Sequence, residues 1–117
     1  MLPQEISNID VAGIVGRWQV DDLHEGHKSL LDIIFANHKK VIVFIGVSNF
    51  LGSKSNPLDY PSRAAMILQH YPSAIVLPIV DQPNSDELWS TSLDSLIRSV
   101  APVGNVLLYG GRDSFVH

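Results

Sequence analysis

Cysteine is absent from the sequence. This absence excludes disulfide bonds, thiolate nucleophiles and cysteine-ligated metal, although it does not identify the redox compartment. Basic residues are also few, because eight Lys and Arg face twelve Asp and Glu, for a formal net charge of −4. They are scattered along the chain, so the positive field of a protein that binds a nucleic-acid backbone is missing. We therefore expect no nucleic-acid partner.

Long apolar runs are missing as well. No stretch approaches the roughly 18 consecutive apolar residues of a membrane-spanning helix, and Glu5 and Asp10 lie where a secretory signal would be basic and then apolar. With 117 residues, 45% hydrophobic and 17% charged, the composition is that of one globular domain. We expect a soluble cytoplasmic protein without a membrane partner, in which residues 1–10 form an N-terminal segment and residues 11–117 form the domain.

Short apolar runs alternate with segments of helical periodicity. The runs cover residues 11–15, 41–45, 74–80 and 106–109. An uninterrupted run of this kind is typical of a strand that is buried on both faces of a parallel sheet. Pro78 lies inside the third run, and because proline removes a hydrogen bond from the ladder, that strand is predicted to lie at the sheet edge.

Three helices are predicted between these strands. The first runs from about residue 24 or 25 to residue 37, and the second has Pro61 in its first turn. The third begins at Asn84, which would form a capping box with Glu87. The third helix carries its apolar residues on one face: Trp89, Leu93, Leu96, Ile97 and Val100. The alternation predicts an α/β fold with a Rossmann-like, doubly wound parallel sheet, right-handed crossovers and strand order 3-2-1-4.

The segment from Gly16 to His27 crosses the carboxyl edge of the first strand, where such sheets bind ligands. It reads Gly-Arg-Trp-Gln, then four residues, then His24-Glu25-Gly26-His27. Gly26 lacks the Cβ that would keep a ligand away from the first turn of the helix. Two histidines around this glycine favour a functional site. On spacing alone, however, His27 is also consistent with a core residue, because it shares a helix face with Leu30, Leu31 and Ile34.

These residues resemble the nucleotidylyltransferase superfamily, and within it the nicotinamide mononucleotide adenylyltransferases, including those fused to a Nudix hydrolase. In that family the stretch usually reads Gly-Arg-Phe-Gln-Pro-Phe-His-x-Gly-His. Here Trp18 replaces the first Phe, and Val20-Asp21-Asp22-Leu23 stands where the family commonly has two residues.

The resemblance implies adenylyl transfer from ATP, bound with Mg²⁺, to nicotinamide mononucleotide, which gives NAD and pyrophosphate. His24 and His27 would be the catalytic residues and would donate hydrogen bonds to the phosphates. The nucleotide site would be lined by Gly16, Arg17, Trp18 and Gly26. No residue of the chain is predicted to ligate a metal.

Two later segments carry the same resemblance. Asp81 follows Pro78-Ile79 and precedes Trp89 by eight residues, which is similar to archaeal-type adenylyltransferases, where this Asp and Trp lie near the nicotinamide. Asp81 and Trp89 are therefore candidate substrate-binding residues, although Trp89 is equally consistent with the first core residue of its helix. Arg63 also matches the family, but we interpret it as a loop anchor rather than a substrate ligand.

Gly110-Gly111-Arg112-Asp113-Ser114 follows the last predicted strand. A Gly-Gly turn lets backbone N–H groups approach a ribose or phosphate, and an arginine there can meet phosphate oxygens. The alternative is an ordinary turn with a solvated arginine. Because related enzymes place a glycine-rich segment with a basic residue and an Asp here, the resemblance implies nucleotide binding by Gly110, Arg112 and Asp113.

The family's second signature, Ile-Ser-x-Thr-x-x-Arg, does not occur before His117. The chain is therefore interpreted as the N-terminal part of a longer nucleotidylyltransferase whose domain lacks its C-terminal part, and a Nudix domain is one candidate for a segment beyond His117. A missing fifth strand would leave a sheet edge open for pairing in a homo-oligomer.

Two other functions remain open. A different acceptor, such as phosphopantetheine or an alcohol phosphate that accepts CMP, would use the same chemistry, although those relatives usually have Gly-Thr-Phe-Asp where this chain has Gly-Arg-Trp-Gln. A non-catalytic fragment that binds nucleotide or protein is the alternative from a different class.

Overall fold

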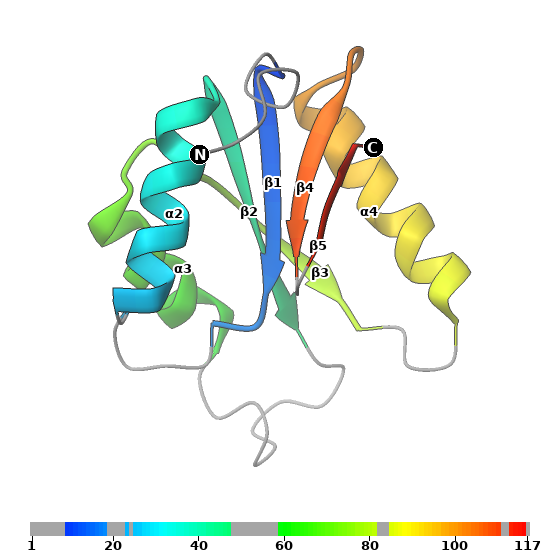
Figure 1. The fold of residues 1–117 in the computed structure, drawn as a ribbon. Helices are drawn as coiled ribbons and strands as arrows, with labels where there is room; N and C mark the ends of the chain where they lie inside the picture. Colours follow the sequence, from blue (N-terminus) through cyan, green and yellow to red (C-terminus); the bar gives the residue numbers. More distant parts are fainter. Residues whose placement is uncertain are drawn as a thin grey trace.

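A computed structural model describes residues 9–18, 23, 25–47, 59–81, 85–110 and 113–116. In this part of the chain, a five-stranded sheet has the order β3-β2-β1-β4-β5 and is covered by helices on both faces (Figure 1). Within the described residues, no helix is both long and apolar enough to cross a membrane.

The first half of the sheet begins at its centre. Strand β1 (Val11–Gly16) leads to helix α2 (Glu25–Asn37) and then to strand β2 (Lys40–Val47). The two strands are parallel, with Val11 opposite Lys40 and Gly16 opposite Ile45. Both strands and the helix lie close to their predicted positions.

The remaining units extend the sheet in both directions. Helix α3 (Tyr60–His70) leads to β3 (Ile75–Val80), which pairs in parallel with β2. Helix α4 (Asp86–Val100) leads to β4 (Val106–Gly110), which pairs in parallel with β1. The predicted order 3-2-1-4 is confirmed, as is the edge position of the strand that contains Pro78.

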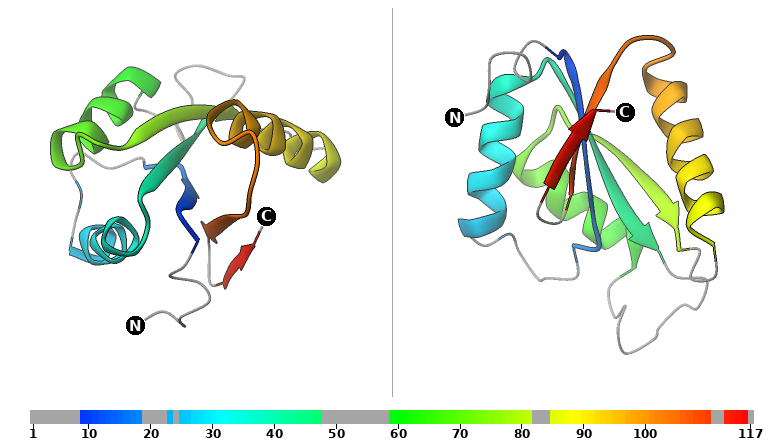
Figure 2. Two further views of the ribbon diagram at one scale, coloured as in Figure 1. Left: turned by 90° about the horizontal axis from the view of Figure 1, so that it is seen from above. Right: turned by 45° about the vertical axis from the view of Figure 1, so that its right-hand side comes forward.

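A fifth strand was not predicted. Strand β5 (Asp113–Val116) pairs antiparallel with β4, with Asp113 opposite Gly110, and Figure 2 shows the two strands side by side. Asp113 and Ser114, in the segment predicted to follow the last strand, belong to a strand of their own. The edge of β4 that was expected to be open is paired, so β5 and not β4 lies at this end of the sheet. The sequence of β5, Asp-Ser-Phe-Val, lacks the uninterrupted apolar run that predicted the other four strands.

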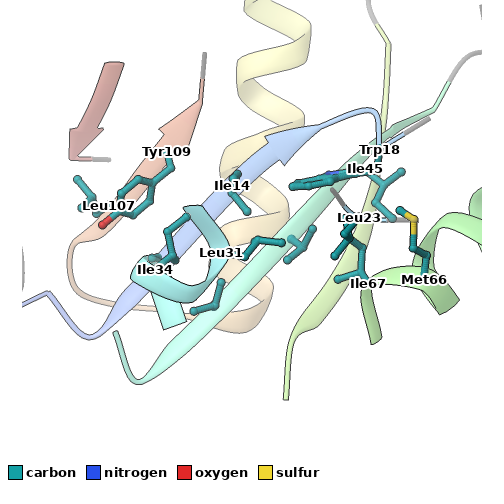
Figure 3. Close-up of a cluster of buried hydrophobic side chains, with 13 residues drawn as sticks. Ile14, Trp18, Leu23, Leu31, Ile34, Ile45, Met66, Ile67, Leu107 and Tyr109 are labelled. Atoms are coloured by element: carbon teal, nitrogen blue, oxygen red, sulfur yellow. The ribbon is translucent and has the colours of Figure 1, made fainter. Parts of the chain in front are cut away.

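Hydrophobic side chains fill two layers because successive residues of a strand point to opposite faces. Val43 and Ile45 of β2 lie in one cluster with residues of α2 and α3, whereas Ile42 and Phe44 lie in the other cluster with residues of α4. In the first cluster, Leu31 of α2 and Ile67 of α3 are fully buried between helix and sheet. Figure 3 labels ten residues of this cluster: Ile14, Trp18, Leu23, Leu31, Ile34, Ile45, Met66, Ile67, Leu107 and Tyr109.

Side-chain caps set the starts of two helices. Asp59 caps α3 by accepting a hydrogen bond from the backbone N–H of Ser62 at 2.8 Å. Ser85 caps α4, and its hydroxyl accepts from the backbone N–H of Leu88 at 3.1 Å. The prediction that Asn84 caps this helix is wrong by one residue, since Ser85 has the extended backbone that a cap requires.

Candidate functional site

The parallel strands β1 to β4 all end at the edge where the site is predicted. Arg17 follows β1 and Asp81 follows β3, and their side chains form a salt bridge between Nη2 and Oδ2. The pair lies over the end of β2, where a Cβ built on Gly46 would be 3.6 Å from Cγ of Arg17 and 3.7 Å from Oδ1 of Asp81. The side chains are 48% and 27% exposed, so solvent reaches both partners.

Trp18 turns the chain sharply at this edge. Its φ angle is +57°, the left-handed region that a non-glycine residue occupies at a cost of roughly 1–3 kcal/mol. The indole is buried in the first hydrophobic cluster, and its Nε1–H donates to the carbonyl of Phe44 at 3.4 Å. Gly16 is needed beside it, because a Cβ there would lie 3.0 Å from Cε2 of the indole. The ring is thus held by the hydrophobic cluster and by its hydrogen bond to β2.

His27 lies in the first turn of α2 and meets Trp18. The two ring centroids are 5.3 Å apart, and the planes are tilted by 56°. The imidazole is half-buried, with Nδ1 buried. The second histidine of the motif therefore lies beside Trp18, just after the end of β1. His24, the other histidine of the motif, lies outside the described residues.

Arg63 is nearly completely buried, at 3% exposure. Its Nη1 donates to the carbonyls of Gly46 at 2.7 Å and Arg17 at 2.8 Å, and its Nε donates to the carbonyl of Asp59 at 3.2 Å. Burial, and then the positive charge of Arg17, lower the pKa of the guanidinium. The interpretation of Arg63 as a loop anchor is confirmed, but its burial was not predicted, because an arginine in a first helical turn usually points to solvent.

The other predicted residues that the structure describes lie on α2, α4, β4 and β5. Gly26 is exposed in the first turn of α2, and Gly110 ends β4 at the same carboxyl edge as Gly16. Trp89 is half-buried on α4 and packs against the second cluster, as the alternative of a core residue predicts. Asp113 begins β5, and Arg112 lies outside the described residues.

His38 is buried, and no pattern in the sequence predicted this. Its Nδ1 lies 2.6 Å from the carbonyl of Ile9, and its Nε2 lies 2.8 Å from the hydroxyl of Tyr109. Because a carbonyl oxygen can only accept, Nδ1 donates to Ile9, and Nε2 shares a hydrogen bond with the tyrosine hydroxyl. His38 follows the end of α2 and precedes β2, away from the carboxyl edge. It joins three segments of the fold and does not belong to the candidate site.

Together, these groups suit an anion. The guanidinium of Arg17, which is paired with Asp81, follows β1, and the imidazole of His27 in the first turn of α2 meets Trp18. Guanidinium groups, imidazoles and helix N-termini favour negatively charged oxygens. Among the described residues, no group of three or more His, Asp or Glu is arranged to hold a metal ion.

The sequence matches no protein-family model, and no curated protein matches it. Among solved structures, a bifunctional NMN adenylyltransferase/ADP ribose pyrophosphatase from Francisella tularensis, complexed with AMP and a manganese ion, is similar over 92% of this chain. The TM-score is 0.76 and the identity is 22%. The chain spans 38% of the length of that protein. At this identity the likeness concerns the fold: the chain has the Rossmann-like, doubly wound α/β fold of part of that bifunctional enzyme.

Proposed function

We propose that this chain carries the nucleotide site of a nucleotidyltransferase, and that the reaction is adenylyl transfer from ATP to nicotinamide mononucleotide. The observation that carries the proposal is the contact between His27 and Trp18 at the carboxyl end of β1. It joins the two halves of the sequence motif at the edge where doubly wound folds bind nucleotides. The activity named for the structural neighbour supports the choice of reaction.

In this reaction, a phosphate oxygen of nicotinamide mononucleotide attacks the α-phosphorus of ATP. The new P–O bond forms as the bond from the α-phosphorus to the bridging oxygen breaks, and pyrophosphate leaves with that electron pair. Mg²⁺ enters with ATP as part of the substrate, because the phosphates supply the oxygen ligands that it prefers. The protein's task is to align the two phosphates and to stabilise the charge on their oxygens.

The described residues divide this task. His27, together with His24, donates hydrogen bonds to phosphate oxygens, and the exposed backbone at Gly26 adds the positive end of the α2 dipole. Arg17 exchanges Asp81 for a phosphate oxygen when the nucleotide binds. Because the Arg17 side chain is 48% exposed, it is already solvated and the exchange costs little desolvation.

The remaining assignments follow the family resemblance. Gly110, Arg112 and Asp113 would contact the nucleotide from the end of β4, and Asp81 and Trp89 would face the acceptor base. Packing of Trp89 against the second cluster gives it a core role in addition. The proposal includes a Nudix domain elsewhere in the gene product, and the structural neighbour likewise combines its adenylyltransferase with an ADP ribose pyrophosphatase.

The test is to incubate the protein with ATP, Mg²⁺ and nicotinamide mononucleotide and to measure NAD and pyrophosphate, which should form in equal amounts. Both the 117-residue chain and the native gene product are assayed, since we expect weak turnover from the chain alone without the family's second signature. Parallel reactions replace ATP by CTP, or the acceptor by phosphopantetheine.

Product in those parallel reactions but not with nicotinamide mononucleotide would contradict the proposed substrates and keep the reaction class. Absence of any nucleotidyl transfer, together with absence of AMP binding by calorimetry, would contradict the proposed function as a whole.

A further inference from the structure

The described residues hold one buried cation that the proposed reaction does not use. Arg63 is 3% exposed, and among the described residues no carboxylate forms an ion pair with it. Its hydrogen bonds go instead to backbone carbonyls of the segment after β1, of β2 and of the residue before α3. A buried charge is costly unless it is fully hydrogen-bonded. An arginine at this position therefore has a structural role that depends on these carbonyls.

This role depends on where the ladder between β1 and β2 ends. The last residue pair of their ladder is Gly16 with Ile45. The carbonyl of Val47 accepts from the N–H of Asp81 on the β3 side. Because successive carbonyls of a strand alternate in direction, the carbonyl of Gly46 points to the β1 side, where β1 has already ended. Nη1 of Arg63 donates one hydrogen to this carbonyl in place of the missing N–H of β1. The same nitrogen donates a second hydrogen bond to the carbonyl of Arg17.

The bond to Arg17 acts on its neighbour. The carbonyl of Arg17 and the N–H of Trp18 belong to one rigid peptide plane, so a donor that fixes the carbonyl also fixes the start of Trp18. Trp18 has a φ angle of +57°, which persists only when the surroundings determine it. Arg63 holds the peptide on one side, and the bond from Nε1 to the carbonyl of Phe44 holds the ring on the other.

We propose that Arg63 is a positioning residue, which holds the Arg17–Trp18 peptide so that the Arg17 side chain meets Asp81 and the Trp18 ring meets His27. The structural part of this inference depends on the hydrogen bonds of Arg63 and the backbone of Trp18. Only its consequence for turnover rests on the proposed function. Lysine cannot replace the arginine, because one ammonium does not present the planar, fixed fork that spans these carbonyls.

The experiment uses the fluorescence of Trp18 in a Trp89→Phe background, where Trp18 is the one remaining tryptophan. We expect Arg63→Lys and Arg63→Met to shift the emission maximum to the red and to increase quenching by acrylamide, while the far-ultraviolet circular dichroism stays that of a folded protein. Arg98→Lys is the matched control, since Arg98 also donates to two backbone carbonyls, those of Ala101 and Gly104, but on α4. It should leave the Trp18 emission unchanged.

Asp81→Asn in the same background removes the salt bridge to Arg17 and keeps the hydrogen bond from Arg63 to the Arg17 carbonyl. It tests the proposal even if Arg63→Met does not fold. The proposal expects unchanged Trp18 emission, because Arg63 still holds the peptide. It is overturned if Asp81→Asn shifts the emission and Arg63→Lys does not, or if Arg98→Lys shifts it as much as Arg63→Lys.

A kinetic readout is made with Trp89 intact. We expect Arg63→Lys to lower kcat/KM for adenylyl transfer by about tenfold, the order of one hydrogen bond to a charged group. If the emission shifts but the wild-type gene product shows neither nucleotidyl transfer nor AMP binding, the proposed function fails and the positioning role stands. If turnover falls without a change in emission, the positioning role is wrong.

Discussion

At the residue scale, Trp18 and His27 form the contact on which the functional proposal depends. Their rings meet at 5.3 Å, next to the salt bridge of Arg17 with Asp81. The strained backbone of Trp18 belongs to the same few residues. Backbone strain of this kind is found at functional sites, where the surroundings hold a conformation that the residue would not choose.

Replacing His27 tests its role in turnover. We expect His27→Ala to lower kcat by roughly a hundredfold or more, because a donor to the developing charge is lost, with little change in the unfolding midpoint. His70→Ala is the control, since His70 ends α3 and that helix runs from the carboxyl edge towards the opposite edge. Near-normal kcat in His27→Ala would end its catalytic assignment.

Replacing Trp18 tests its anchor on β2. Trp18→Phe restores the aromatic residue usual in the family but removes the 3.4 Å hydrogen bond to the Phe44 carbonyl. We expect the free energy of unfolding in urea to fall by about 1 kcal/mol. Trp89→Phe makes the same exchange on a half-buried side chain of α4 and should cost less. Equal losses would show that the indole bond contributes nothing specific.

The residue types of the site were predictable, whereas their contacts were not. The motif identified Gly16, Arg17, Trp18 and His27 as one segment. The pairing of Arg17 with Asp81 joins residues 64 positions apart, and it depends on the order in which the strands assemble. The burial of Arg63 likewise depends on distant carbonyls, which no local pattern encodes.

At the element scale, α2 and α3 are joined on the side of the sheet that carries the candidate site. Tyr71, just after α3, stacks on Phe35 of α2 with centroids 4.8 Å apart. Its hydroxyl lies 2.7 Å from Oδ1 of Asp32 and donates to that carboxylate. This contact helps to hold α2, and with it the first turn that carries His27.

The contact gives a pH dependence of stability. Burial, and then the hydrogen bond and charge of Asp32, raise the pKa of Tyr71 to about 12. The unfolded value is about 10, so the stabilisation is fully present below pH 10 and is lost as the pH rises through about 12. We expect the difference in unfolding free energy between wild type and Tyr71→Phe to shrink over this range.

The measurement is urea unfolding of both proteins below and above a pH of about 10. Asp32→Asn serves as the companion variant, because it removes the charge that helps to raise the Tyr71 pKa. The difference in unfolding free energy between Asp32→Asn and the double variant Asp32→Asn/Tyr71→Phe should vary less with pH. A wild-type difference that is constant across the range would contradict the linkage.

The helices and long strands were predictable because their patterns are local. Helix α2 begins at Glu25 and ends at Asn37, within a residue of the prediction. The cap of α4 was not assigned correctly, since Asn84 and Ser85 are both good caps and only the backbone decides between them. Strand β5 was missed because its pairing with β4 depends on a chain reversal rather than on its own composition.

At the scale of the whole molecule, the sheet is built outward from β1 and β2. Both strands have a neighbour on each side and helices over each face, whereas β3 has one neighbour and contains Pro78. The order of the parallel strands was predictable because each crossover is right-handed and each strand is followed by a helix. The antiparallel end of the sheet obeys no such rule.

This architecture predicts the pattern of amide exchange. We expect the amides of β1 and β2 to exchange slowest, because they open only with global unfolding, and those of β3 to exchange faster. Hydrogen exchange followed by NMR gives the rate for each amide. Protection in β3 equal to that in β1 would show that the edge is not the weaker part of the sheet.

The central claim is that a nucleotide binds where β1 ends. The most direct measurement is a titration of the ¹⁵N-labelled protein with ATP and Mg²⁺, followed by NMR. The account predicts that the largest shifts occur at Arg17, the Trp18 backbone and indole, and the first turn of α2 at Gly26 and His27. Saturable shifts confined to other parts of the protein, or the absence of saturable shifts at any concentration that the sample tolerates, would contradict it.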